Sequence, residues 1–122
     1  DRDGVGEFVR AWESPPLFET QRALSPAASA AQRAWRTGNT ARGLAWSLRT
    51  LGLGRQPPCR DAFARSTLPV TLVTGGRDEK FTAIARELVR LRSGVEHVVV
   101  GGAGHNVALE DPDAVARAVA TG

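Results

Sequence analysis

Cysteine and long apolar runs are scarce in this sequence. Cys59 is the only cysteine among 122 residues, so no disulfide can form within the chain, and a disulfide-stapled secreted scaffold is excluded. No apolar run approaches the roughly 20 residues that a membrane-spanning helix needs. From these absences we expect a cytoplasmic protein without a membrane partner.

Methionine is absent, even at the first position, and the chain opens on "DRDGVGEF". We therefore expect this chain to be the carboxy-terminal piece of something longer. The net charge of +3 comes from arginines scattered through predicted helices, without the interleaved aromatic residues of a single-strand binder. This distribution predicts no nucleic-acid partner.

Helix start and stop signals dominate the first half of the chain. Residues 25–38 begin with a serine that can cap a helix and a proline that fits its first position, and they end on glycine. A second helix is expected within residues 39–52. Leu44, Leu48 and Leu51 recur there at helical spacing, which predicts a buried stripe.

The pattern changes in the second half, where strands and helices are expected to alternate. "LPVTLVTGG" (68–76) and "EHVVV" (96–100) are short β-branched runs that predict buried strands. "FTAIARELVRLRSG" (81–94) predicts a helix between them. "DPDAVARAV" (111–119) predicts a last helix, with a capping aspartate, proline at its first position and its valines facing inward.

Strand, helix, strand and helix in this order form a βαβα unit, whose strands lie parallel with a right-handed crossover. We assign the chain to the α/β class, with a helical segment at 1–66 and a βαβα portion at 67–122. Two parallel strands cannot cover both faces of a sheet, because such sheets usually contain more strands beneath helices on each side. The fold is therefore expected to be incomplete, with its other strands upstream.

Asp78 and His105 each follow a predicted strand. The carboxyl ends of parallel strands share one sheet edge, where functional residues collect, so these two side chains are expected to approach each other. An aspartate that accepts from one imidazole nitrogen leaves the other nitrogen able to take a proton from a nucleophile. The alternative is that Asp78 only caps the helix beginning near Phe81 and that His105 is an ordinary turn residue.

Other ligand motifs are not supported. His97 and His105 have no third metal ligand at useful spacing, so no metal is expected. "GGAGHN" lacks the spacing of a dinucleotide or phosphate loop, so no nucleotide cofactor is expected either.

Several longer motifs resemble one enzyme family. "GGRDEKFTAIA" and "VVVGGAGHNVALEDPDAV" resemble the end of the α/β-hydrolase fold, with G-x-x-D, G-A-G-H and a downstream E-x-P. The D-x-K-F version is similar to the menaquinone-pathway lyases named 2-succinyl-6-hydroxy-2,4-cyclohexadiene-1-carboxylate synthase. "FVRAWESPPLF" and "RTGNTARGLAWSLRTLGLGRQPP" resemble that family's cap. The resemblance covers nearly the whole chain and implies cap helices plus the carboxy-terminal βαβα portion of the fold.

The resemblance implies roles for four residues. Asp78 would be the acid and His105 the histidine of a catalytic triad, while Arg36 and Trp12 would line the substrate pocket. The family's reaction removes a proton alpha to a carbonyl and releases pyruvate, without a cofactor. Its substrate carries carboxylates, which an arginine fork suits. Arg49 is a weaker candidate, and the alternatives are a solvated helix face for each arginine and ordinary cap core for the tryptophan.

The chain departs from the family pattern at three places. No G-x-S-x-G nucleophile elbow occurs in the sequence. Ser47 and Ser93 lie in or at the end of predicted helices, and Ser66 precedes a predicted strand, so none of them can be the elbow serine. Ala108 and Cys59 occupy places where the family often has a second histidine and a tryptophan. The serine is therefore expected upstream or on another chain.

These observations predict the carboxy-terminal part of a pyruvate-eliminating lyase that acts on a small carboxylate-bearing substrate. Its partner would be the missing amino-terminal portion of the fold, in the same or another chain. Two alternatives stay open: an ester or carbon–carbon bond hydrolase of the same superfamily, and a non-catalytic remnant or binding module.

Overall fold

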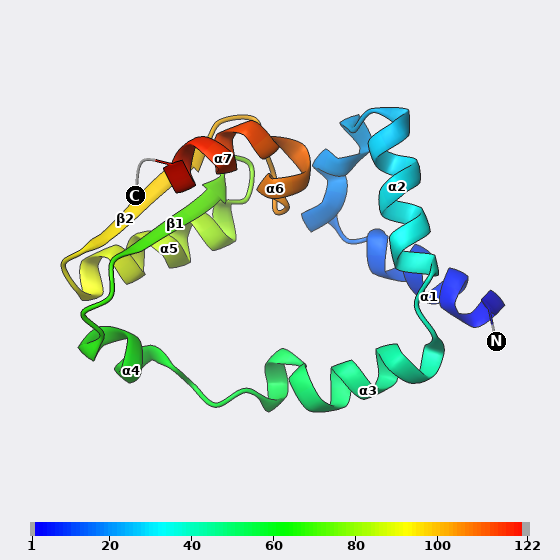
Figure 1. The fold of residues 1–122 in the computed structure, drawn as a ribbon, viewed down its shortest axis with the longest axis horizontal. Helices are drawn as coiled ribbons and strands as arrows, with labels where there is room; N and C mark the ends of the chain where they lie inside the picture. The colour runs from blue at the N-terminus through cyan, green and yellow to red at the C-terminus, as the bar shows by residue number, and fades with distance from the viewer. Residues whose placement is uncertain (1, 121–122) are drawn as a thin grey trace. The chain divides into compact units, whose positions relative to one another are not determined.

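The computed structural model describes the backbone of residues 2–120 and the side chains of residues 4–120. Helices fill most of the chain and two strands lie in its second half (Figure 1). In chain order the elements are α1 (Arg2–Glu13), η1 (Pro16–Ala23, a 3₁₀ helix), α2 (Pro26–Thr37), α3 (Ala41–Leu51), η2 (Leu53–Arg55, also 3₁₀), α4 (Arg60–Arg65), β1 (Val70–Gly75), α5 (Glu79–Leu91), β2 (Val95–Val100), α6 (Val107–Glu110) and α7 (Pro112–Ala120).

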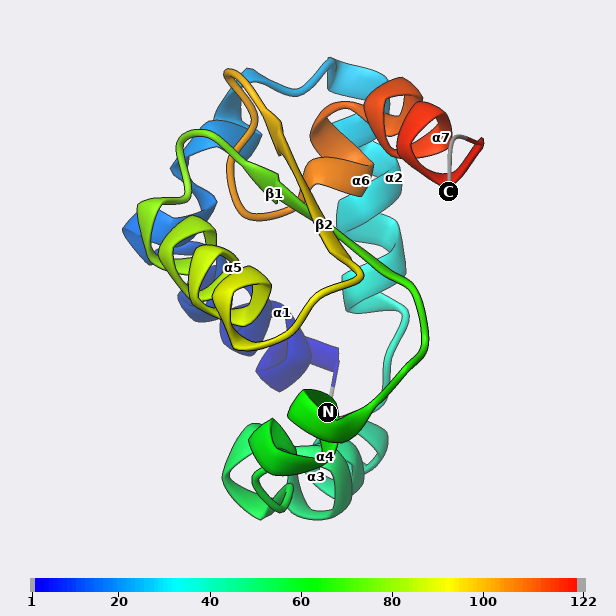
Figure 2. The ribbon, with the colours of Figure 1, turned by 90° about the vertical axis from the view of Figure 1, so that its left-hand side faces the viewer.

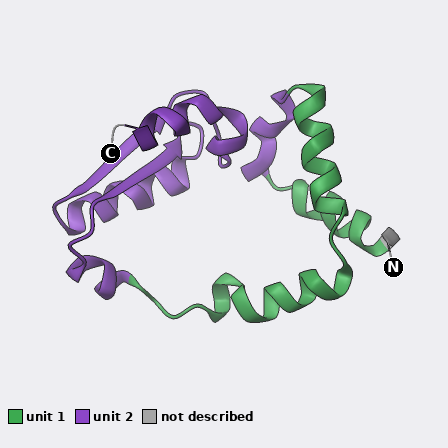
Figure 3. Cartoon of the chain, viewed as in Figure 1, with its two compact units in different colours: residues 1–15, 25–59 green, residues 16–24, 60–122 purple. Residues whose placement is uncertain are grey.

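The chain divides into two compact units (Figure 3). Unit 1 contains Asp1–Pro15 and Ser25–Cys59, and unit 2 contains Pro16–Leu24 and Arg60–Gly122. The short helix η1 thus groups with the two strands, although it lies within the first half of the sequence. The domain boundary after residue 66 stays a prediction.

The helices of unit 1 begin and end at the expected signals. The Ser25 hydroxyl accepts a hydrogen bond from the Ala28 amide at 3.2 Å, and proline follows at the first helical position of α2. The Thr40 hydroxyl caps α3 in the same way, accepting from the Gly43 amide at 3.1 Å. Each cap satisfies a backbone donor that the first helical turn leaves without a partner.

The prediction of a buried leucine stripe on α3 is wrong for Leu48 and Leu51. Leu44 is half-buried, but Leu48 is 48% exposed and Leu51 is 63% exposed. Within unit 1, α3 packs mainly against α1 and η2, and these short elements do not cover both leucines. Helical spacing predicted which residues share a face, but it could not predict what covers that face.

The two strands of unit 2 pair in parallel, as predicted. Their register runs from Val70 opposite Val95 to Gly75 opposite Val100, without offset. Helix α5 covers one face of this ribbon and α7 covers the other (Figures 1 and 2). Because successive side chains in a strand point to opposite faces, each strand supplies residues to both helices.

The core of unit 2 lies between the strands and the last two helices. Its buried members are Val100, Ala103, Val107 and Ala114, with Val73, Val98 and Val115 packed against them. The Asp111 carboxylate accepts from the Ala114 amide at 2.9 Å and caps α7 as expected. Val119 is 75% exposed, contrary to the prediction, because α7 centres its buried face on Ala114 and Ala118.

Gly75 lies at the closest approach between the end of β1 and the loop after β2. A Cβ atom added there would collide with the backbone carbonyl oxygens of Ala103 and Gly104. Backbone atoms cannot move aside as a flexible side chain can, so only glycine fits this position without displacing the loop.

We predict that Gly75→Ala lowers the free energy of unfolding by about 1–3 kcal/mol, because the methyl group would overpack this contact. Gly101→Ala is the matched control, since a Cβ at Gly101 meets nothing within 4 Å; it should change stability by no more than about 0.5 kcal/mol. Urea denaturation of both variants measures the difference. Equal stabilities would contradict the close approach.

Candidate catalytic site

Backbone hydrogen bonds continue past the ends of the strands and join the two loops that follow them. The Gly76 amide donates to the Val100 carbonyl at 2.8 Å, and the Arg77 amide donates to the Ala103 carbonyl at 3.0 Å. The turn after β1 and the loop after β2 are therefore held side by side. These are the two segments that carry the predicted acid and the predicted histidine.

Asp78 and His105 form a direct hydrogen bond at this edge of the sheet. The distance from Asp78 Oδ2 to His105 Nδ1 is 2.7 Å, with 4% of the aspartate side chain and 30% of the imidazole exposed. An ionised carboxylate only accepts hydrogen bonds, so the pairing places a proton on Nδ1. Nε2 is then the nitrogen that can exchange a proton with another group.

The same aspartate also caps α5. Asp78 Oδ1 accepts from the Phe81 amide at 3.1 Å, while the Thr82 amide donates to the Asp78 carbonyl at 3.0 Å. Asp78 therefore both caps α5 and bonds the imidazole, with a different carboxylate oxygen in each role. Capping fixes the plane of the carboxylate and so directs Oδ2 at the imidazole.

Two phenylalanine rings flank the imidazole, and sequence reasoning missed both as site residues. The Phe81 ring lies with its centroid 4.6 Å from that of His105, at an interplanar angle of 51°. Phe18, on η1, meets His105 at 5.9 Å and 66°, an edge-on contact. Aromatic rings at these distances restrict the tilt of the imidazole.

A cavity of about 280 Å³ opens beside the Asp78–His105 pair. Apolar side chains of β1 and α5 form most of its wall, which would limit the access of water to the pair. The lining residues are Leu72, Val73, Thr74, Gly75, Asp78, Phe81, Ile84, Ala85, Leu88 and His105.

The Glu110 carboxylate contacts the histidine loop. Its Oε2 accepts from the Gly104 amide at 2.7 Å, and its Oε1 accepts from the Asn106 amide at 3.3 Å. The E-x-P motif marked this residue, but its spacing did not predict a contact with the loop.

Arg36 and Trp12, both in unit 1, line one cavity of about 230 Å³. Arg36 Nη1 lies 2.7 Å from Glu13 Oε1, and Arg33 Nη2 lies 3.5 Å from the other oxygen of that carboxylate. The sequence analysis missed this acidic partner. The complete lining is Phe8, Val9, Trp12, Arg36, Asn39, Leu44, Ser47 and Leu48.

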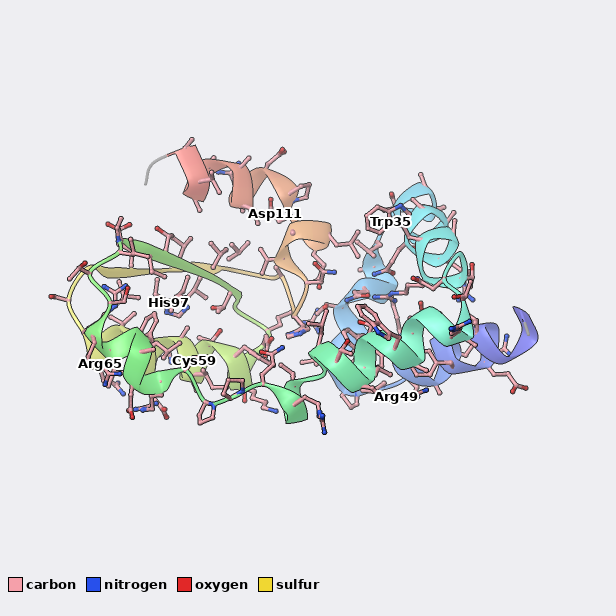
Figure 4. The ribbon with its side chains drawn as sticks, turned by 60° about the horizontal axis from the view of Figure 1, so that its bottom comes forward. Trp35, Arg49, Cys59, Arg65, His97 and Asp111 are labelled. Atoms are coloured by element: carbon pink, nitrogen blue, oxygen red, sulfur yellow. The ribbon has the colours of Figure 1, made fainter. Side chains whose placement is uncertain are left out.

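Arg49, the weaker candidate, is exposed on α3 and does not line that cavity (Figure 4). Cys59 is exposed, with its Sγ 3.3 Å from the Pro57 carbonyl oxygen. His97 bonds through Nε2 to the Thr74 hydroxyl at 2.8 Å, beside the sheet. None of these three side chains lines either of the two cavities described above.

Metal ligands do not gather in the described part of the chain: no three His, Cys, Asp or Glu side chains there could hold an ion together. Among residues 2–120, no helix has both the length and the apolar character to cross a membrane. The expected cytoplasmic location stays a prediction.

Comparison with known proteins agrees with the fold. The pattern of the alpha/beta hydrolase family matches residues 2–118, and the chain belongs to that family. Its relatives include the 2-succinyl-6-hydroxy-2,4-cyclohexadiene-1-carboxylate synthase of Enterobacter sp. (strain 638), which is 34% identical over 119 residues; the match covers 98% of this chain and 43% of that protein.

Two further matches agree with that relative. A Bacillus subtilis (strain 168) protein that carries the same synthase name provisionally is 38% identical over 111 residues, covering 91% of this chain and 40% of that protein. The solved structure of MenH from S. aureus matches with a TM-score of 0.91 and 26% identity, over 96% of this chain and 44% of that chain. The chain thus spans less than half the length of the relatives it matches, and it corresponds to part of the α/β-hydrolase fold, as its motifs predicted.

We predict that Asp78→Asn moves the proton of neutral His105 from Nδ1 to Nε2. Asparagine still caps α5 through its oxygen, so its NH₂ group faces the imidazole and requires an acceptor there. Long-range ¹H–¹⁵N spectra of the imidazole identify the tautomer.

Asp78→Ala is the comparison for the capping role. It should lower stability by about 1 kcal/mol through loss of the cap, whereas Asp78→Asn should not. An unchanged tautomer in Asp78→Asn would show that the carboxylate does not orient the imidazole.

Proposed function

We propose that this chain supplies the acid and the histidine of a catalytic triad to a lyase that forms 2-succinyl-6-hydroxy-2,4-cyclohexadiene-1-carboxylate by eliminating pyruvate. The observation that carries the proposal is the 2.7 Å hydrogen bond between the buried Asp78 carboxylate and His105 Nδ1. Relatives that bear this synthase name support the choice of reaction.

The proton path follows from the orientation of the imidazole. A serine hydroxyl from outside this sequence would lose its proton to His105 Nε2, and Asp78 would stabilise the imidazolium that forms. The activated serine would remove the proton alpha to the substrate carbonyl and so become neutral again. As the new carbon–carbon double bond forms, the carbon–oxygen bond to the leaving group would break, and His105 would give its proton to the departing enolate, which becomes pyruvate. A side chain in this role contributes typically 10²- to 10⁴-fold to the rate.

Substrate binding is assigned to the cavity of unit 1. A guanidinium binds a carboxylate through two parallel hydrogen bonds, and Arg36 is the one arginine among the lining residues of that cavity. Its contact with Glu13 holds the side chain in place when no substrate is bound. Trp12 would supply a flat apolar surface beside the carboxylate.

The proposal requires a partner segment. The sequence contains no G-x-S-x-G, and the matched relatives are more than twice as long as the part that this chain covers. We assign the serine and the remaining strands to the amino-terminal portion of the fold, in the same or another chain. No step of the scheme uses a metal or an organic cofactor.

An ester or carbon–carbon bond hydrolase of the same family is the second candidate. The Asp78–His105 pair suits acyl transfer equally well, because serine activation is the first step of both reactions. Ala108 and Cys59 at places where the lyases often have histidine and tryptophan keep this candidate open.

The two activities differ in their products. The chain together with its amino-terminal portion should release pyruvate, and His105→Ala should lower that rate about 10²- to 10⁴-fold. Coupled pyruvate detection and p-nitrophenyl ester turnover are measured in parallel. Rapid ester turnover without pyruvate would reject the lyase, and inactivity in both assays would favour the non-catalytic remnant.

Arg36→Ala should lower kcat/KM about 10- to 100-fold, through the loss of a charged hydrogen-bond donor to the substrate. Arg36→Lys should recover little of that loss, because an ammonium cannot form the paired bonds. Arg49→Ala is the matched control on the exposed surface of α3 and should leave kcat/KM within about twofold. Equal losses in Arg36→Ala and Arg49→Ala would remove Arg36 from the binding site.

A further inference from the structure

The loop that carries His105 has little conformational restraint of its own. Gly101, Gly102 and Gly104 all precede the histidine, and Gly102 has a φ of +85°. Glycine has more accessible backbone conformations than any other residue, so such a loop does not hold one imidazole position by itself. A side chain at Gly104 cannot supply the restraint, because its Cβ would collide with Thr20.

The Glu110 carboxylate restrains this loop through hydrogen bonds. Glu110 is the last residue of α6, which follows the loop directly, and its side chain turns back toward the start of that helix. Its two oxygens accept from the Gly104 amide at 2.7 Å and the Asn106 amide at 3.3 Å, so the amides on both sides of His105 are held by one carboxylate. Hydrogen bonds to an ionised acceptor are about twice as strong as those between neutral groups.

We propose that Glu110 is a positioning residue for His105. Its carboxylate fixes the backbone before and after the imidazole, so that Nδ1 stays on Asp78 and Nε2 keeps its direction. The catalytic consequence rests on the proposed function, but the positioning does not. Glu110 acts through the backbone and touches neither the substrate nor the imidazole in this scheme.

Capping of α6 alone is the competing explanation. A cap would affect the stability of the four-residue helix α6, but it would not change the rate at which the imidazole proton exchanges with solvent. The proton on His105 Nδ1 separates the two explanations, because its exchange with water requires the bond to Asp78 to open.

The test uses the chain together with its amino-terminal portion, and the His105 imidazole signal is identified as the one that is lost in His105→Ala. Glu110→Gln keeps the shape of the side chain but replaces one acceptor with a donor. We expect exchange of the His105 Nδ1 proton to accelerate about tenfold or more, since a bond to a charged group is lost. Glu96→Gln, an exposed acid on β2, is the matched control and should leave the exchange rate unchanged.

If the His105 Nδ1 proton exchanges in Glu110→Gln at the same rate as in the wild type, the proposal is overturned. If that variant does not fold, the wild-type chain still provides a test. As the pH is varied, the amide proton chemical shifts of Gly104 and Asn106 should change together with the ¹³C chemical shift of the Glu110 carboxyl group. Amide shifts that do not change together with that carboxyl signal would overturn the proposal as well. Failure of pyruvate release alone would reject the proposed function and leave the positioning role standing.

Discussion

β1 and β2 run in parallel without offset, so both strands end at the same edge of the sheet. Two backbone hydrogen bonds beyond that edge hold the following segments together, and Gly75 permits the close approach between them. Asp78 and His105 are 27 positions apart in the sequence, and this pairing brings them into contact. A shift of one strand by one residue in the register would turn that strand's side chains to the opposite face and separate the two groups.

The Asp78 carboxylate serves the fold and the candidate chemistry together. One oxygen caps α5 and the other bonds the imidazole, while the side chain is almost completely buried. A buried carboxylate is costly unless its oxygens are hydrogen-bonded, and these two bonds meet that requirement. Because the helix cap fixes the carboxylate plane, the stability of α5 and the orientation of His105 depend on the same side chain.

Sequence reasoning worked where local chemistry or topology decides the outcome. The cap at Ser25 depends on its immediate neighbours, and the approach of Asp78 to His105 follows from two parallel strands. It failed for Leu51 and Val119, because their exposure depends on which elements pack above them.

The contacts of Glu13 and Glu110 were missed for a related reason. Glu13 meets Arg36 across 23 positions, and helical periodicity carries no information about the partner of a charged side chain on another helix. Glu110 lies only six positions from Gly104, but its carboxylate turns back over α6 to reach two amides of a glycine-rich loop. A motif can mark such a residue, but it does not reveal the residue's partners.

In the proposed triad the carboxylate and the imidazole form one hydrogen-bonded unit that serves a serine from the remaining part of the fold. The decisive measurement is a high-resolution crystal structure of the chain together with its amino-terminal portion. We expect Asp78 Oδ2 within hydrogen-bonding distance of His105 Nδ1, and a serine hydroxyl within reach of Nε2. An imidazole turned away from Asp78, or no hydroxyl within reach of Nε2, would overturn the proposed triad.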